Sequence, residues 1–203
     1  ATHCRADIQT RSAGVRPARA PTDTASNFQW IKSFSPSNIS GNHLASRGNS
    51  VYLARSSSYN NSDTLSLTKF SHTGLEQFRY FSLLNPLGSL HSIREINIDN
   101  KGNLHIVGEM YNRNFDFDLK PNSTHILTTN TNSSVDGYYF SIDSNCTFRY
   151  LVPFQTPGAV APLNVQSDEF GFQYVNIIGT NGLNLNPLGT STPYNSSAST
   201  NSL

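Results

Sequence analysis

The chain has 203 residues, of which 36% are hydrophobic and 13% charged, and its formal net charge is +1. Average soluble domains contain roughly 45–50% apolar and about 25% charged residues, so this chain is unusually rich in uncharged polar side chains. Two cysteines exclude a disulfide framework, and no apolar run approaches the ~20 residues of a membrane-spanning helix. Asn, Ser and Thr form helices poorly, which favours β structure with long loops.

The N-terminal segment differs in composition from the rest of the chain. Four of the fourteen basic residues lie in the first nineteen positions, and the remainder holds ten basic and twelve acidic side chains. That remainder lacks the basic stripe that neutralises phosphates, so we expect no nucleic-acid partner. We interpret residues 1–24 as a disordered basic leader or a cloning remnant; the alternative is a basic arm for an anionic partner. Because Cys4 lies in this segment, we expect no bridge to Cys146.

Beyond residue 25 the sequence repeats itself. A triplet of two aromatic residues around a polar one occurs three times, as Phe28-Gln29-Trp30, Phe78-Arg79-Tyr80 and Phe148-Arg149-Tyr150. Each copy begins a segment in which large residues alternate with polar ones, as in a half-buried strand. A second marker, Gly48–Ala54, matches Gly102–Gly108, and a degenerate third copy lies in residues 168–179. Repeats of this kind indicate a repeat architecture.

The middle unit contains four strand-like segments, at residues 93–98, 103–109, 137–143 and 147–153. The turn Asp99–Gly102 separates the first pair and Asp143–Cys146 the second, as Ser71–Gly74 does in the preceding unit. We expect Leu104, Ile106, Phe140, Ile142, Phe148 and Tyr150 to be buried. His105 alternates with apolar neighbours, which predicts a solvent-facing side chain.

Four strands in each unit are typical of a β-propeller blade. The predicted fold is therefore all-β, an incomplete β-propeller with about two four-stranded antiparallel blades. These blades span about 42–83 and 93–154, after a closing strand at 28–34 and before a partial blade at about 162–203. Propellers close with four to eight blades, so we expect the fragment at 25–203 to need missing blades, a partner copy or an open arrangement.

Four features follow one another in the middle unit: the turn Asp99 to Asn103, the strand end Ile106-Val107-Gly108, the segment Asp116-Phe117-Asp118, and the aromatic strands 140–143 and 148–150. In these features the unit resembles the bacterial β-propeller repeats called SBBP-type, and the resemblance extends over residues 28 to about 195. The first unit lacks the Asp-Phe-Asp segment, and the third has Asn184-Leu185-Asn186 in its place. The resemblance implies a secreted or cell-surface, modular bacterial protein and implies no particular substrate.

Patterns typical of enzymes are scarce. The sequence has no Gly-x-Ser-x-Gly elbow and no closely spaced histidine pair. Glycoside hydrolysis needs two carboxylates about 5–10 Å apart. Four of the thirteen acids lie at expected turn positions, where backbone hydrogen bonding explains them: Asp99, Asp136, Asp143 and Asp168.

The insertion from Tyr111 to Val135 separates the second and third strands of the middle unit, and long loops in compact repeats are usually functional or disordered. Its candidate ligand-binding residues are Tyr111, Arg113, Asn122 and His125. Asp116 and Asp118 would lie on one side of an extended segment, which suits calcium; the alternative is an exposed acidic edge. We expect no other cofactor.

The sequence thus predicts a non-catalytic scaffold or binding module, secreted or at the cell surface, whose ligand is a polysaccharide or a protein. Its remaining partners would be missing blades or neighbouring domains of the same parent chain. The alternative is a fragment of a propeller glycosidase or lyase with its catalytic groups largely in missing blades. Two carboxylates from separate blades facing one pocket would favour that enzyme.

Overall fold

The structure is a computed structural model that describes residues 39–59, 62–83, 91–111, 114–119, 123–128, 135–156, 158–179, 183–184, 193–194 and 201–202. The described residues form β-strands and no helix, which confirms the all-β prediction, and none of them could cross a membrane as a helix. The leader at 1–24 and the closing strand at 28–34 lie outside the described residues.

The first sheet is a meander of four antiparallel strands. Its strands are β1 (Ile39–Arg47), β2 (Ser50–Tyr59), β3 (Ser62–Ser71) and β4 (Glu76–Leu83), hydrogen-bonded in that order. This sheet confirms the four-stranded antiparallel unit predicted for residues 42–83.

The second sheet contains the four strands predicted for the middle unit. They are β5 (His91–Ile98), β6 (Leu104–Met110), β9 (Asp136–Ile142) and β10 (Phe148–Phe154), in the order β10-β9-β6-β5. All three strand pairs are antiparallel. The insertion between β6 and β9 leaves the sheet order unchanged.

The third sheet pairs β11 (Val160–Ser167) with β12 (Gln173–Gly179), and β15 (Asn201–Ser202) pairs with the end of β12. Beside it, β13 (Leu183–Asn184) pairs with β14 (Pro193–Tyr194).

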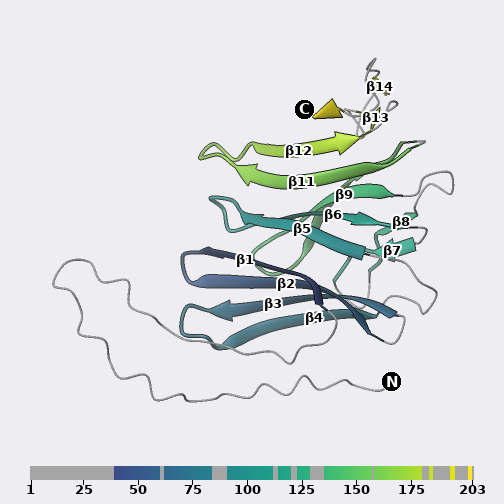
Figure 1. Cartoon of the computed structure of the whole chain (residues 1–203). Helices are drawn as coiled ribbons and strands as arrows, with labels where there is room; N and C mark the ends of the chain where they lie inside the picture. The colour runs from purple at the N-terminus through teal and green to yellow at the C-terminus, as the bar shows by residue number, and fades with distance from the viewer. Residues whose placement is uncertain are drawn as a thin grey trace, which may run out of the picture.

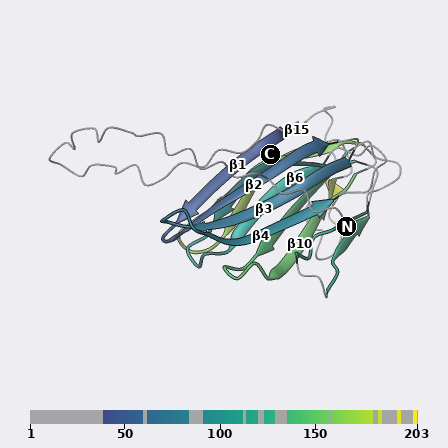
Figure 2. The ribbon, with the colours of Figure 1, turned by 90° about the horizontal axis from the view of Figure 1, so that it is seen from below.

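The three sheets lie face to face in a stack, as Figure 1 shows from the side and Figure 2 from below. The first strand of each following sheet makes the junction: β5 lies against β1, β2 and β3, and β11 lies against β5, β6 and β9. No sheet closes on itself within the described residues.

Two hydrophobic clusters fill the junctions. The larger joins Tyr52 and Leu67 of the first sheet to Ile106 and Phe140 of the second. The smaller joins Val107 and Tyr139 to residues of the third sheet, including Val160, Val165 and Ile177. Every residue of β6 and β9 is buried, because the second sheet is covered on both faces.

Three sequence expectations need correction because of this packing. His105 is buried, since its side of β6 faces the third sheet rather than solvent. Phe148 and Tyr150 are only partly buried, because β10 is the edge strand of its sheet. Leu104, Ile106, Phe140 and Ile142 are buried as predicted.

The described part of the insertion, residues 114–119 and 123–128, packs onto the core. It contains a hairpin of β7 (Asn114–Asp116) and β8 (Ile126–Thr128). Four of its apolar side chains join the larger cluster, namely Phe115, Phe117, Leu119 and Leu127, whereas Ile126 is exposed. The hairpin is therefore part of the core on one side and carries its polar residues on the other.

The predicted turns are built alike. Asp99, Asp143 and Asp168 each accept hydrogen bonds from the amides two and four residues later. The fourth residue of each turn has a positive φ, 81° at Gly102, 60° at Cys146 and 90° at Gly171. These aspartates are thus structural, as expected for turn positions.

Candidate functional site

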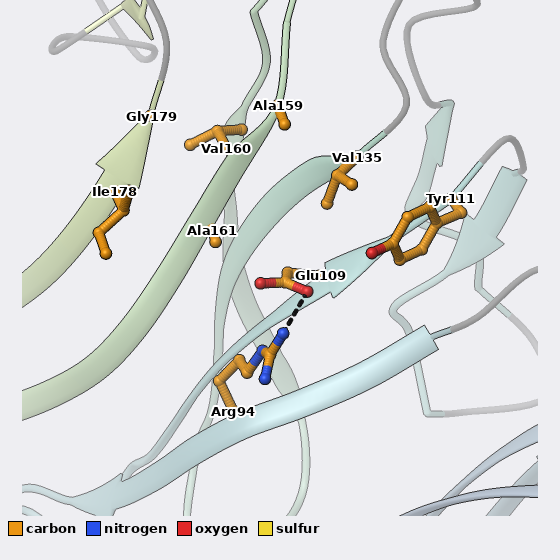
Figure 3. A pocket seen from close by; sticks show the side chains of 9 residues that line it. All are labelled: Arg94, Glu109, Tyr111, Val135, Ala159, Val160, Ala161, Ile178 and Gly179. Carbon is orange, nitrogen blue, oxygen red and sulfur yellow. Dashed lines mark hydrogen bonds and ion pairs between the residues drawn. The ribbon is translucent and has the colours of Figure 1, made fainter. Parts of the chain in front are cut away.

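A cleft of about 290 Å³ lies between the second and third sheets. Its lining residues are Arg94, Glu109, Tyr111, Val135, Ala159, Val160, Ala161, Ile178 and Gly179 (Figure 3). They lie at the strand ends opposite the tight Asp99 and Asp168 turns. This volume is just below the roughly 300–1,000 Å³ of small-molecule sites, which suits one small group rather than a large ligand.

An ion pair forms the polar wall of the cleft. A bulge in β5, where the register shifts between Ile93 and Glu95, places Arg94. Its Nη2 atom lies 2.7 Å from Oε2 of Glu109 on the neighbouring strand β6. The Glu109 side chain is 4% exposed, whereas that of Arg94 is 48% exposed. The carboxylate is therefore enclosed while the guanidinium reaches the opening.

The pair is electrostatically coupled. The hydrogen bond from Arg94 to Glu109 is the main reason that the pKa of the guanidinium is raised. A guanidinium has five N–H donors, more than its contact with Glu109 uses. The site can therefore offer hydrogen-bond donors to a ligand beside an already neutralised carboxylate.

The other walls are apolar and aromatic. The Tyr111 ring lies across the cleft from the third sheet, with its hydroxyl on the side of Glu109 (Figure 3). The opposite wall is held close by the amide of Val160, which donates to the Val135 carbonyl at 3.2 Å. Close approach of β11 also needs Gly137, because a Cβ there would lie 2.6 Å from Cδ of Pro162.

The structure divides the predicted ligand residues between two places. Tyr111 lines the cleft, whereas Asp116, Asp118 and His125 lie on the hairpin. Arg113 and Asn122 lie outside the described residues. The sequence interpretation missed Arg94 and Glu109. Their signal is a pair of opposite charges fifteen residues apart, one on each side of the predicted Asp99 turn.

The hairpin acids stabilise their own hairpin. Oδ1 of Asp116 accepts hydrogen bonds from the amides of Asp118, at 2.9 Å, and His125, at 2.8 Å. Oδ2 of Asp118 accepts from the Ser123 hydroxyl and lies 3.4 Å from Nδ1 of His125. The His125 ring also stacks on Phe148, with centroids 3.8 Å apart. Asp118 is buried, so the expected exposed acidic edge is wrong for that residue.

Calcium at Asp116 and Asp118 is a sequence-based hypothesis that the structure leaves untested. The described residues contain no group of three or more acidic, His or Cys side chains that could hold a metal ion. Because hydrogen bonds already account for both acids, we expect a calcium chelator to leave the melting temperature unchanged. A chelator-induced drop that Asp116→Asn removes would instead establish a calcium site.

A chain of hydrogen-bonded polar groups runs along the face of the second sheet that meets the third sheet. His105 contacts Asp99 Oδ2 through Nε2, at 3.2 Å, and the Tyr139 hydroxyl through Nδ1, at 2.8 Å. The Tyr139 hydroxyl in turn lies 2.7 Å from that of Tyr150. Burial lowers the pKa of His105 and outweighs the opposing effect of Asp99. The imidazole is thus neutral at physiological pH and acts as a structural hydrogen-bonding group.

This buried histidine makes stability depend on pH. The unfolded chain binds a proton at His105 below about pH 6.5, whereas the folded protein does so only at lower pH. Unfolding therefore takes up a proton, and we expect the melting temperature to fall as the pH drops below about 6.5. His105→Gln should make this fall shallower and leave the contribution of His43, whose pKa burial also lowers. An unchanged pH profile in that variant would contradict the argument.

Comparison of the sequence with models of known protein families gives no match, and comparison with curated proteins gives none either. These comparisons lend no support to the SBBP-type resemblance, which stays a prediction. The geometry of the cleft and the packing of the sheets are therefore the features that indicate a function.

Proposed function

We propose that the chain is a non-catalytic binding module of the β-propeller type that holds a sugar unit of a polysaccharide in the cleft between its second and third sheets. The observation that carries the proposal is the cleft itself, which combines an enclosed carboxylate, an accessible guanidinium and an aromatic ring. A secreted or cell-surface location is part of the proposal and comes from the SBBP-type resemblance.

The stacking of the sheets supports the propeller part of the proposal. In a propeller, four-stranded sheets are arranged radially around a central channel. Here the first strands β1, β5 and β11 are neighbours in the stack, and each sheet runs outward from its first strand. The tight turns gather at one end of the stack and the β7–β8 hairpin lies at the other (Figure 1). The cleft is at the hairpin end.

The chemistry of the cleft supports a sugar as the ligand. Aromatic rings supply large contact area with a polar tip, and Tyr111 provides one at the opening. The Arg94 guanidinium can donate to hydroxyl groups while Glu109 holds it in place. Because the ion pair is already neutral, the cleft favours an uncharged polar group over a charged one. A protein ligand remains the alternative, with a polar side chain in the same place.

The acidic side chains that line the cleft favour binding over hydrolysis. A glycosidase needs two carboxylates about 5–10 Å apart, and one of them protonates the leaving group. Among the described residues that line the cleft, Glu109 is the single acid, and it is paired with Arg94. A propeller glycosidase or lyase would need its second acid from elsewhere.

A glycan array followed by titration calorimetry tests the proposal. We expect binding to at least one polysaccharide and a loss of about tenfold or more in affinity in Tyr111→Ala, because the variant removes the ring but keeps the ion pair. His125→Ala, on the hairpin, is the matched control and should bind normally. An array without any bound glycan would contradict the proposal that the cleft binds a sugar. Loss of binding in His125→Ala but not in Tyr111→Ala would contradict it as well. Release of sugar from the bound ligand would favour the glycosidase.

A further inference from the structure

The third sheet repeats the second at a spacing of 69 residues, and equivalent positions touch. Asn100 Nδ2 donates to the carbonyl of Glu169, and Asn97 Nδ2 donates to Gln166 Oε1 at 3.4 Å, each pair being 69 residues apart. Both first strands carry a bulge at the same position, between Ile93 and Glu95 in β5 and at residues 162–164 in β11. The two sheets are therefore copies of one packing unit.

This equivalence identifies an uncovered face. Tyr174 occupies the position of His105, and both bond the Oδ2 atom of their own turn aspartate, at 3.1 Å and 3.2 Å. His105 is 1% exposed because the third sheet covers it, whereas Tyr174 is 59% exposed. The far face of the third sheet, which points away from the second sheet, is thus equivalent to the face of the second sheet that the third sheet covers.

The neighbour of that face must offer a first strand, because β5 and β11 make both existing junctions. Among the described first strands, the one with an uncovered side is β1, at the other end of the stack. Leu44 of β1 is 65% exposed and alternates with the inward-facing His43 and Ala45. On the same side of β2 and β3, Leu53 and Phe70 are buried, so β1 is the accessible part.

Charge also matches between the two ends of the stack. The second residue of the β5–β6 turn, Asn100, contacts the second residue of the β11–β12 turn, Glu169. Continuing the repeat places Glu169 beside the β1–β2 turn of another molecule. Arg47 is exposed at that turn, so opposite charges would meet there.

We propose that the far face of the third sheet, which carries the exposed Tyr174 and, at the bulge of β11, the exposed Leu163, binds β1 of a second copy of this chain, head to tail. Three stacked sheets from each of two copies give six, within the four to eight that close a propeller ring. Two such contacts, related by a two-fold rotation, close without a free end. The inference rests on the propeller part of the proposed function and does not require the proposed ligand.

The mass of the full chain in solution tests this arrangement. Analytical ultracentrifugation should give twice the 22.3 kDa of one chain. Tyr174→Arg on the far face and Leu44→Asp on β1 should each lower the dimer fraction. Because both side chains are exposed in one chain, both variants should keep the circular dichroism spectrum of the folded protein. Ile126→Asp, at an equally exposed position of the hairpin, is the control and should remain dimeric.

Mixing the two interface variants identifies the geometry. The far face of the Leu44 variant and β1 of the Tyr174 variant are both intact, so the mixture should form a mixed dimer through one contact. A monomer at all concentrations would overturn the proposal. A dimer that Tyr174→Arg weakens but Leu44→Asp does not would also overturn it, because two far faces would then be bound to each other. Ligand binding by either variant at the cleft is measured separately.

Discussion

Replacing Phe117 by alanine is expected to lower the free energy of unfolding by about 3–5 kcal/mol, the range for deletion of a fully buried aromatic side chain. Phe117 is 0% exposed. Its ring packs against Phe115, Tyr138 and Phe140, with centroids 4.5, 4.9 and 5.0 Å away. The hairpin thus stabilises the second sheet instead of decorating it.

Urea unfolding of Phe117→Ala beside Ile126→Ala measures this effect. Ile126 belongs to the same hairpin but is 60% exposed, so its loss should cost less than about 0.5 kcal/mol, as for surface substitutions. Equal and small effects of the two substitutions would mean that the hairpin does not pack on the core. A drop confined to Phe117→Ala confirms that the insertion is part of the hydrophobic core.

Strands and tight turns were the most predictable part of this fold. Alternating residues specify a strand locally, and a turn aspartate followed three residues later by glycine specifies its own hydrogen bonds. Both four-stranded sheets therefore follow from the sequence. The β7–β8 hairpin does not, because its strands have three residues each and its buried Phe115 and Phe117 alternate with acids that indicate a surface loop.

The side of the sheet on which each side chain lies was less predictable than the position of the strand in the sequence. The sequence match of Gly48–Ala54 with Gly102–Gly108 aligns Tyr52 with Ile106, yet these side chains meet from opposite sheets in one cluster. The β1–β2 turn has two residues, whereas β5 and β6 are joined by residues 99–103. A difference of one residue in register reverses every side chain of a strand, so only the structure sets the faces.

The candidate site depends on these faces and so could not be predicted in full. Tyr111 was identified from the composition of the insertion. Arg94 and Glu109 meet only because of the bulge in β5 and the register of β5 against β6. The burial of Glu109 further requires the third sheet, whose packing no local pattern specifies.

The second large effect is expected for Gly108→Ala, at the glycine that ends the apolar run of β6. A Cβ at this position would lie 2.1 Å from the backbone carbonyl of Ser92 and 2.2 Å from the hydroxyl of Tyr138. Real Cβ atoms do not tolerate such contacts, so β5 or the fully buried Tyr138 must move. Tyr138 donates to the same Ser92 carbonyl, at 3.3 Å, and would lose that bond as well.

We expect Gly108→Ala to lower the free energy of unfolding by at least the ~1–3 kcal/mol of overpacked cores, and to disturb the cleft because Glu109 is the next residue. Gly179→Ala is the matched control, since Gly179 also ends an apolar run, and a Cβ there would meet Val160 at an ordinary 3.4 Å. The stability of this variant should change by less than about 1 kcal/mol, because the added methyl group makes only ordinary van der Waals contacts. Similar midpoints for both variants in urea would mean that β5, β6 and Tyr138 do not approach as closely as described. A loss confined to Gly108→Ala, with Arg94 and Glu109 unpaired in the variant, would tie the strand-ending glycine directly to the geometry of the cleft.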